Sequence, residues 1–350
     1  MASTASRWPA LRGGWLALTA AALFGISTPL VQRLGVGIGS FATAALLYAG
    51  AALIGAVLRR SIGQEARVRP RDTAKLAVMA LFGAGIGPVA LAWGLQHTSG
   101  TSASLMLTLE AVFTAVLAWL WYHETLDRRV ILAMALLTLG GAALVLDRAD
   151  AGPSQVLGLV VVLVATAAWG VDNSVSRALA ERDPGQVVMI KGALGATATA
   201  LLAVAFGEPL PRLGPALGLL LVGASGYGLS LRFYLLAQRA FGAARTGSVF
   251  AFAPFVGAAV AFLLGERSGS AWMLLGAALM AAGIVLHLAE RHSHEHQHDA
   301  IEHEHAHTHD DPHHAHAHPV STGRHSHVHR HEPVRHAHAH VPDEHHAHRH

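Results

Sequence analysis

The sequence contains no cysteine among its 350 residues, and only 13% of its residues are charged. The absence of cysteine excludes disulfide bonds, thiolate metal sites and cysteine nucleophiles. Hydrophobic residues make up 52% of the chain, and so apolar a composition does not describe a water-soluble protein. The composition therefore predicts an integral membrane protein.

Charge and histidine content divide the chain at residue 290. Residues 1–290 carry 20 basic and 13 acidic residues with three histidines, whereas residues 291–350 carry 5 basic and 9 acidic residues with 23 histidines. The arginines flank apolar runs instead of forming a stripe, which excludes a nucleic-acid-binding surface. No nucleophile, carboxylate pair or catalytic metal constellation is evident before residue 290, so we expect no enzymatic activity.

Ten apolar runs, each about as long as a membrane-spanning helix, follow one another before residue 290. Only helices satisfy their own backbone in lipid, and a barrel would show a period of two, so we expect ten transmembrane helices. They are predicted at residues 13–34, 39–58, 73–96, 101–122, 127–147, 156–178, 184–206, 213–238, 243–264 and 270–290.

The connections between these spans differ in their arginine content. Because positively charged loops stay in the cytoplasm, the bias predicts a multi-pass protein of the bacterial inner membrane with both termini in the cytoplasm. The arginines of the N-terminus and of the loops after even-numbered spans are Arg7, Arg12, Arg59, Arg60, Arg67, Arg69, Arg71, Arg128, Arg129, Arg182 and Arg239, against Arg148, Arg212 and Arg267 on the other side.

The two halves of the apolar region repeat each other. The pair Phe24-Gly25 in the first span parallels Trp169-Gly170 in the sixth, and Glu110 in the fourth span falls opposite Pro254 in the ninth. The repeating unit is therefore five helices. Because five is odd, the second copy must be inverted relative to the first. The predicted units are residues 13–147, residues 156–290 and a tail of residues 291–350.

Several motifs together resemble a known transporter family. They are Ser102-x-Ser104-Leu105, Glu110-Ala111-Val112-Phe113-Thr114-Ala115, Trp169-Gly170-Val171-Asp172-Asn173, Ala244-Arg245-Thr246 and Ala253-Pro254-Phe255. The region from about residue 13 to residue 290 resembles the EamA-type branch of the drug/metabolite transporter superfamily. The resemblance implies a duplicated ten-helix carrier with cytoplasmic termini, of a kind that exports many different metabolites. The chain departs from that pattern at Glu110, where many relatives have proline, and in its histidine-rich tail.

Four ionisable residues lie well inside predicted spans: Glu110, Asp172, Lys191 and Arg232. Unpaired charges in the bilayer are costly, so these side chains must face the protein interior or water. One interpretation is that they form structural ion pairs between helices. The other is that Lys191 and Arg232 attract an anionic group of a substrate while Glu110 couples transport to protons. With Asn173 and Pro254, these four residues are our candidates for the transport pathway.

The tail is rich in His-x-His and low in large apolar residues, so we expect a disordered cytoplasmic segment. Neutral imidazole suits Zn²⁺, Ni²⁺, Co²⁺ and Cu²⁺, and many overlapping sites would form a buffer of graded affinity. A pH-responsive tail without a metal role is the alternative. The candidate metal ligands are His292, His294, His296, His298, His303, His305, His307, His309, His325, His327, His329 and His331.

These patterns favour a secondary active carrier that exports a small organic metabolite or drug by alternating access, with a metal-binding regulatory tail. A divalent metal exporter is the first alternative, and a membrane-anchored metal sensor or buffer is the second. We expect lipid, a small-molecule substrate and divalent metal ions as partners, no required cofactor and no nucleic acid; a homodimer stays open.

Overall fold

The computed structural model describes residues 7–60, 65–122, 128–149, 152–241, 243–266, 270–288, 293–298, 301–307, 325–331 and 334–339. Everything described up to residue 288 is helical apart from short connections and one isolated bridge between Ala66 and Arg182. This part of the chain agrees with the predicted all-α membrane protein.

Fourteen α-helices make up the described membrane region. They are α1 (Arg7–Leu34), α2 (Ser40–Leu58), α3 (Thr73–Met79), α4 (Gly87–His97), α5 (Gly100–Met106), α6 (Glu110–Tyr122), α7 (Arg128–Ala149), α8 (Pro153–Ser176), α9 (Pro184–Ala205), α10 (Leu213–Val222), α11 (Ser230–Phe241), α12 (Ala243–Phe250), α13 (Ala253–Leu263) and α14 (Ala271–Leu288). Short 3₁₀ turns lie at Pro70–Asp72, Leu107–Leu109 and Arg177–Leu179, and π-helical segments at Ala80–Ile86 and Gly223–Leu229.

Within the described residues, nine helical stretches are long and apolar enough to cross a membrane. They match the first nine predicted spans, and α14, in the tenth position, is apolar over the shorter stretch Ala271–Leu286. We number the positions as spans 1–10: span 3 comprises α3 and α4, span 4 α5 and α6, span 8 α10 and α11, and span 9 α12 and α13.

Spans 3, 4, 8 and 9 are interrupted near their middles. In spans 3 and 8 the interruption is a glycine-containing π-helical segment, whose wide turn leaves backbone carbonyls available to other partners. Span 9 breaks after Phe250, and Pro254 lies in the first turn of α13, where its missing N–H is not needed. Pro29 does not interrupt span 1, because α1 continues through it.

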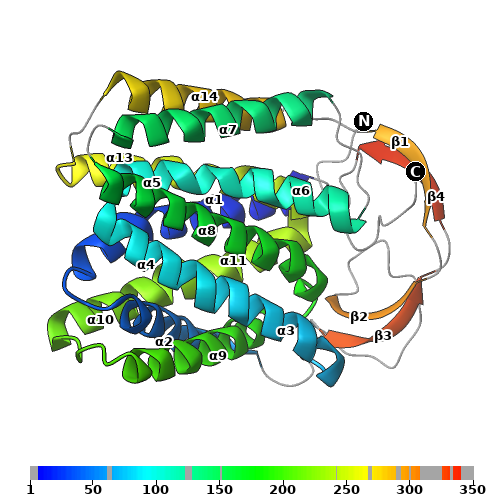
Figure 1. Cartoon of the computed structure of the whole chain (residues 1–350). Coiled ribbons are helices and arrows are strands. Elements are labelled where there is room, and N and C mark those ends of the chain that lie inside the picture. The colour runs from blue at the N-terminus through cyan, green and yellow to red at the C-terminus, as the bar shows by residue number, and fades with distance from the viewer. Residues whose placement is uncertain are drawn as a thin grey trace.

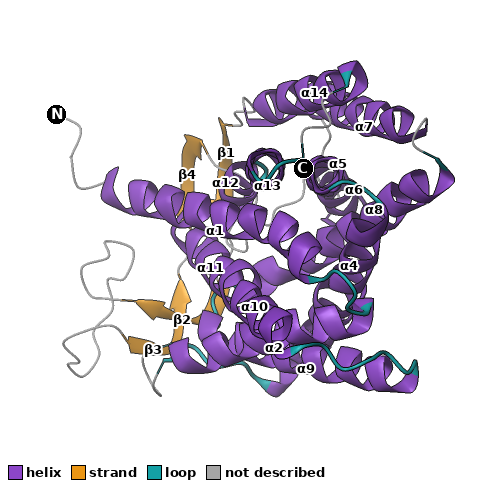
Figure 2. Cartoon of the chain, turned by 90° about the vertical axis from the view of Figure 1, so that its left-hand side faces the viewer, coloured by secondary structure: helices purple, strands orange, loops and turns teal. Residues whose placement is uncertain are grey.

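The helices lie side by side in an elongated bundle, with α2 against α9 at one side and α7 against α14 at the other (Figures 1 and 2). Between these two pairs, α1 packs on α11 and α13, and α8 packs on α4 and α6. The centre of the bundle is therefore formed by spans 1, 3, 4, 6, 8 and 9.

The contact between spans 2 and 8 is a close approach of two backbones. A Cβ atom added to Gly223 would overlap the carbonyl oxygen of Leu47, and one added to Gly50 would overlap that of Leu220. Small residues permit such approaches, which supply the van der Waals packing that holds membrane helices together.

The described parts of the tail contain four short strands: β1 (Ser293–His298), β2 (Ile301–His307), β3 (His325–His331) and β4 (Val334–Ala339). β1 pairs with β4 and β2 with β3, both antiparallel, at one end of the bundle (Figure 1). The composition predicted disorder, and the structure differs from it in these segments. The His-x-His repeat has the period of a strand, and antiparallel pairing needs backbone hydrogen bonds but no core.

Replacing Gly223 with valine should destabilise the bundle, because the rigid backbone of α2 cannot move aside. Overpacking costs about 1–3 kcal/mol of the free energy of unfolding, which we expect as a lower melting temperature of the detergent-solubilised protein. Gly214→Val is the matched control, because it lies in the same span with no atom within 4 Å of its added Cβ. Equal melting temperatures for the two variants would contradict the close contact.

Candidate functional site

A buried ion pair lies at the centre of the bundle. Lys191 of α9 donates from its Nζ to Oδ2 of Asp172 on α8 at 2.5 Å, and the two side chains are only 3% and 4% exposed. The second carboxylate oxygen, Oδ1, is buried and has no hydrogen-bond partner among the described residues. The pair thus satisfies one oxygen of Asp172 and leaves the other available to a ligand.

The carboxylate of Asp172 lies directly over Gly83, in the π-helical segment of span 3. A Cβ atom added to Gly83 would overlap that carboxylate, so only glycine fits here. The Gly83 carbonyl lies five residues before Pro88, which has no N–H to complete the π-helical hydrogen bond. It accepts instead from the hydroxyl of Tyr48 and from Nε1 of Trp169, the latter at 3.1 Å.

A second acid lies beside this pair. Glu110 is the first residue of α6, directly after the 3₁₀ turn that interrupts span 4, and its Oε1 accepts a hydrogen bond from Nδ2 of Asn173. Among the described residues, Asp172 and Lys191 are the charged groups that act electrostatically on Glu110.

Aromatic rings from both halves of the chain meet next to these charges. The Phe24 ring has its centroid 5.4 Å from that of Trp169, 5.7 Å from that of Tyr227 and 5.5 Å from that of Phe250. The ring centroids of Tyr48 and Tyr227 are 5.5 Å apart. Phe24 and Trp169 occupy equivalent positions of the internal repeat, so the two copies touch at corresponding residues. We call Phe24, Tyr48, Trp169 and Tyr227 the aromatic cluster.

The structure brings four of the six candidate pathway residues together and leaves two outside. Asp172, Asn173, Lys191 and Glu110 form the central polar group, whereas Pro254 lies in the first turn of α13, which packs on α1. Arg232 is half-buried and donates from Nη1 to the carbonyl oxygen of Leu58 at 3.3 Å, at the end of α2. The expectation that Arg232 shares a group with Lys191 is therefore wrong, because its long side chain reaches the end of the neighbouring span.

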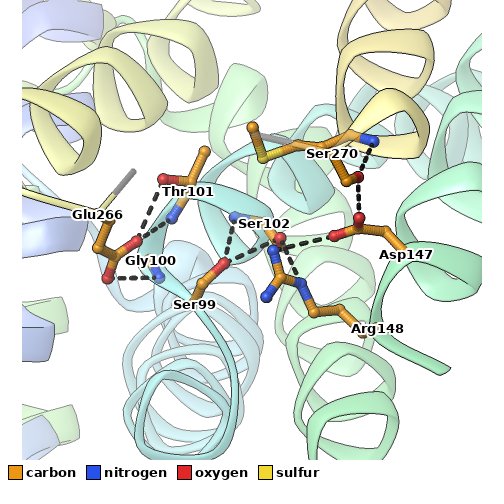
Figure 3. A network of polar contacts seen from close by, with 9 residues as sticks. Ser99, Gly100, Thr101, Ser102, Asp147, Arg148, Glu266 and Ser270 are labelled. Carbon is orange, nitrogen blue, oxygen red and sulfur yellow. Dashed lines mark hydrogen bonds and ion pairs between the residues drawn. The ribbon is translucent and has the colours of Figure 1, made fainter. Parts of the chain in front are cut away.

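A network of polar contacts closes the end of the bundle where α5 begins (Figure 3). Glu266 accepts from the backbone N–H of Gly100 at 3.1 Å and of Thr101 at 2.9 Å, which caps the N-terminus of α5. Nearby, Arg148 donates to Ser102 at 3.1 Å and pairs with Asp147, which accepts from Ser270. These contacts join spans 4 and 5 to the segment between α13 and α14.

Ion pairs also join the opposite end of the bundle. Arg182 pairs with Asp72 at 2.8 Å, and Arg239 pairs with Glu65 at 2.8 Å while donating to the carbonyl oxygens of Ala180 and Arg182. The central polar group thus lies between two tied ends.

Comparison with known proteins identifies the family of the chain. The model of the EamA-like transporter family matches residues 11–146 and again residues 156–289. The chain belongs to the EamA-like transporter family. An uncharacterized transporter of Methanothermobacter thermautotrophicus is 28% identical over 238 residues, which cover 65% of this chain and 68% of that protein. A solved crystal structure, described only as that of a protein, has a TM-score of 0.57 and 18% identity, covering 78% of this chain and 94% of the other, and so supports the fold.

Membership of this family identifies the chain as a multi-pass membrane protein that transports small molecules. EamA-like proteins are transporters and not enzymes, which agrees with the expected lack of enzymatic activity.

The sequence analysis missed two residues of the site. One is Gly83, over which the Asp172 carboxylate lies, and the other is Tyr48, which donates to the Gly83 carbonyl. A signal for the first was present: a glycine followed five residues later by proline leaves a free carbonyl wherever the helix widens. Tyr48, a lone tyrosine in an apolar span, gave no such signal.

Ten of the twelve candidate metal ligands lie in strands β1, β2 and β3, while His292 and His309 lie outside the described residues. Where side chains are described, no group of three or more His, Asp or Glu residues could hold a metal ion. In the strands, the backbone register places His303 opposite His329, His305 opposite His327 and His307 opposite His325.

Removing one partner of the central ion pair should cost more than removing both. Lys191→Met leaves the Asp172 carboxylate buried without its cation, which typically costs about 3–5 kcal/mol, whereas an apolar replacement of the whole pair is often nearly neutral. We therefore expect the Asp172→Asn/Lys191→Met double variant to melt at a higher temperature than Lys191→Met alone. A double variant that is less stable than both single variants would show that the two residues contribute independently.

Proposed function

We propose that this protein is a secondary active carrier that exports a small organic solute by alternating access between two inverted five-helix repeats. The observation that carries the proposal is the central polar group, which lies between two tied ends at the level where spans are interrupted. Interrupted helices at matching places in two repeats are typical of substrate sites in carriers.

The pattern of helix contacts supports ten spans and the two-fold relation. Exchanging each span with the one five positions away turns the contact of span 1 with span 8 into that of span 6 with span 3. The same exchange turns the contact of span 1 with span 9 into that of span 6 with span 4. Spans 2 and 7 pair with each other, as do spans 5 and 10. The π-helical segments Ala80–Ile86 and Gly223–Leu229 start 143 residues apart. Such equivalence favours a ten-span chain over one with an unrelated last helix.

The orientation that we propose follows the arginine distribution, with both termini in the cytoplasm of a bacterial cell. The Arg182–Asp72 and Arg239–Glu65 pairs then face the cytoplasm, and the network around Glu266 faces outward. Opening one end requires that its polar contacts separate while those at the other end persist. The π-helical segments and the break between α12 and α13 are the places where a helix bends most easily.

Glu110 is the group that we propose for proton coupling. It is partly buried, has one hydrogen-bond partner in Asn173, and faces the titratable groups Asp172 on α8, Lys191 on α9 and Tyr234 on α11. An acid in the membrane interior that can exchange its proton is a common element of proton-driven transport. Asp172, whose carboxylate is held by Lys191, is less free to exchange.

Glu110→Gln should abolish proton-coupled flux. Glutamine keeps a hydrogen-bonding amide beside Asn173 but carries no titratable proton. In proteoliposomes with an imposed pH gradient, we expect the gradient to drive efflux of a transported amine, amino acid or drug by the wild-type protein and to have no effect on the variant. Glu208→Gln is the control, because Glu208 caps α2 away from the centre. Undiminished coupling in Glu110→Gln would remove Glu110 from the mechanism.

We propose further that the tail binds divalent metal ions on the cytoplasmic side and regulates the carrier. The opposed histidine positions of β2 and β3 support this, since imidazole is a ligand of Zn²⁺, Ni²⁺, Co²⁺ and Cu²⁺. The central group contains no histidine, which favours an organic cargo over a metal ion, although a metal exporter supplied by the tail stays the alternative.

Vesicles test the tail and the orientation together. Inside-out vesicles should be retained on immobilised Ni²⁺ and right-side-out vesicles should not, because the histidines then face the medium only in the former. A chain truncated after Glu290 should lose retention and keep its flux of organic solute. Retention of right-side-out vesicles would overturn the orientation. Retention of the truncated chain would overturn the assignment of metal binding to the tail. If cells that carry the truncated chain lose only their metal resistance, the metal exporter is favoured.

A further inference from the structure

The central polar group has an unequal number of charges. It contains two carboxylates, Glu110 and Asp172, and one ammonium, Lys191. Arg232, the fourth ionisable residue inside a predicted span, lies instead at the end of α2. With both acids ionised, the group therefore has a net charge of −1.

A net charge in the membrane interior is unfavourable, so the group is most stable when one positive charge joins it. A proton on Glu110 supplies that charge, and so does a bound monovalent cation. A bound anion would make the net charge of the group −2, and a bound divalent metal ion would make it +1. Charge alone thus ranks a monovalent cation above the other classes of ligand.

The surroundings of Asp172 fit an organic cation. Its Oδ1 atom is buried without a partner among the described residues and can accept a hydrogen bond from an ammonium group. Tyr48 and Trp169 both donate to Gly83, the residue over which this carboxylate lies, so the aromatic cluster adjoins the charge. The faces of aromatic rings attract cations, the more so where water is excluded.

We propose that the substrate is a monovalent organic amine with an apolar or aromatic body. Its ammonium group binds the free oxygen of Asp172, its body packs on the aromatic cluster, and it exchanges for one proton on Glu110. Such an exchange leaves the charge of the site unchanged. This inference rests on the carrier function proposed above and specifies its substrate class.

Three ligands with the same aromatic body and different charges test the proposal. 2-Phenylethylamine is a cation at pH 8, as a lysine side chain is, while 2-phenylethanol is neutral and phenylacetate is an anion. Titrated into the purified full-length protein at pH 8 by calorimetry, the amine should bind most tightly and phenylacetate most weakly. Equal affinities, tighter binding of phenylacetate, or no binding of any of the three would overturn the proposal.

Two variants test the role of charge in the same assay. Glu110→Gln makes the group neutral and should weaken binding of the amine at least about tenfold, while the affinity for 2-phenylethanol stays unchanged. A tenfold change corresponds to a small part of the attraction between unit charges a few ångströms apart. Arg232→Gln should preserve the preference for the amine. If Arg232→Gln instead weakens phenylacetate selectively, the site is built for anions and the inference fails. In that case, proton-coupled flux of another class of solute would still support the proposed carrier function.

Discussion

A charge inside a bilayer must be neutralised by the protein that carries it, and the pair between Asp172 and Lys191 meets this requirement at the centre of the bundle. The pair fixes α8 against α9 and needs the space left by Gly83, because any side chain there would displace the carboxylate. That space lies in a widened turn, and Pro88 frees the carbonyl that Tyr48 and Trp169 bind. This electrostatic constraint thus accounts for the glycine at position 83 of span 3.

The two halves share a backbone plan and differ in chemistry. Spans 3 and 8 both contain π-helical segments, and spans 4 and 9 are both interrupted. The interruption of span 4 places Glu110 at the start of α6, whereas the corresponding break in span 9 places Pro254 in α13. In the proposed carrier, alternation between two open ends would require equivalent scaffolds, while a single binding site would require that only one copy supply the acid. Duplication followed by divergence of a few side chains satisfies both requirements.

The polar contacts at the two ends follow the same physical rule as the centre, because each buried charge there has a partner. Glu266 caps α5 through backbone N–H groups, and Arg239 combines an ion pair with two carbonyl acceptors. The side chains of the Arg182–Asp72 and Arg239–Glu65 pairs are only 5–11% exposed, so these are buried pairs. In the proposed alternating access, the contacts of one end separate while the central pair keeps its geometry.

The all-helical membrane fold and nine of the spans could be predicted from the amino-acid sequence alone. These depend on apolar length and backbone chemistry, which act over a few residues. The sequence also predicted which ionisable residues lie inside the spans, Asp172 and Lys191 among them. The position of the Arg232 side chain could not be predicted, because helical rise gives the depth of a Cα atom but not the direction of a long side chain. The meeting of Gly83, Tyr48 and Trp169 was likewise decided by packing among three spans, because contacts between residues distant in sequence leave no local pattern to read.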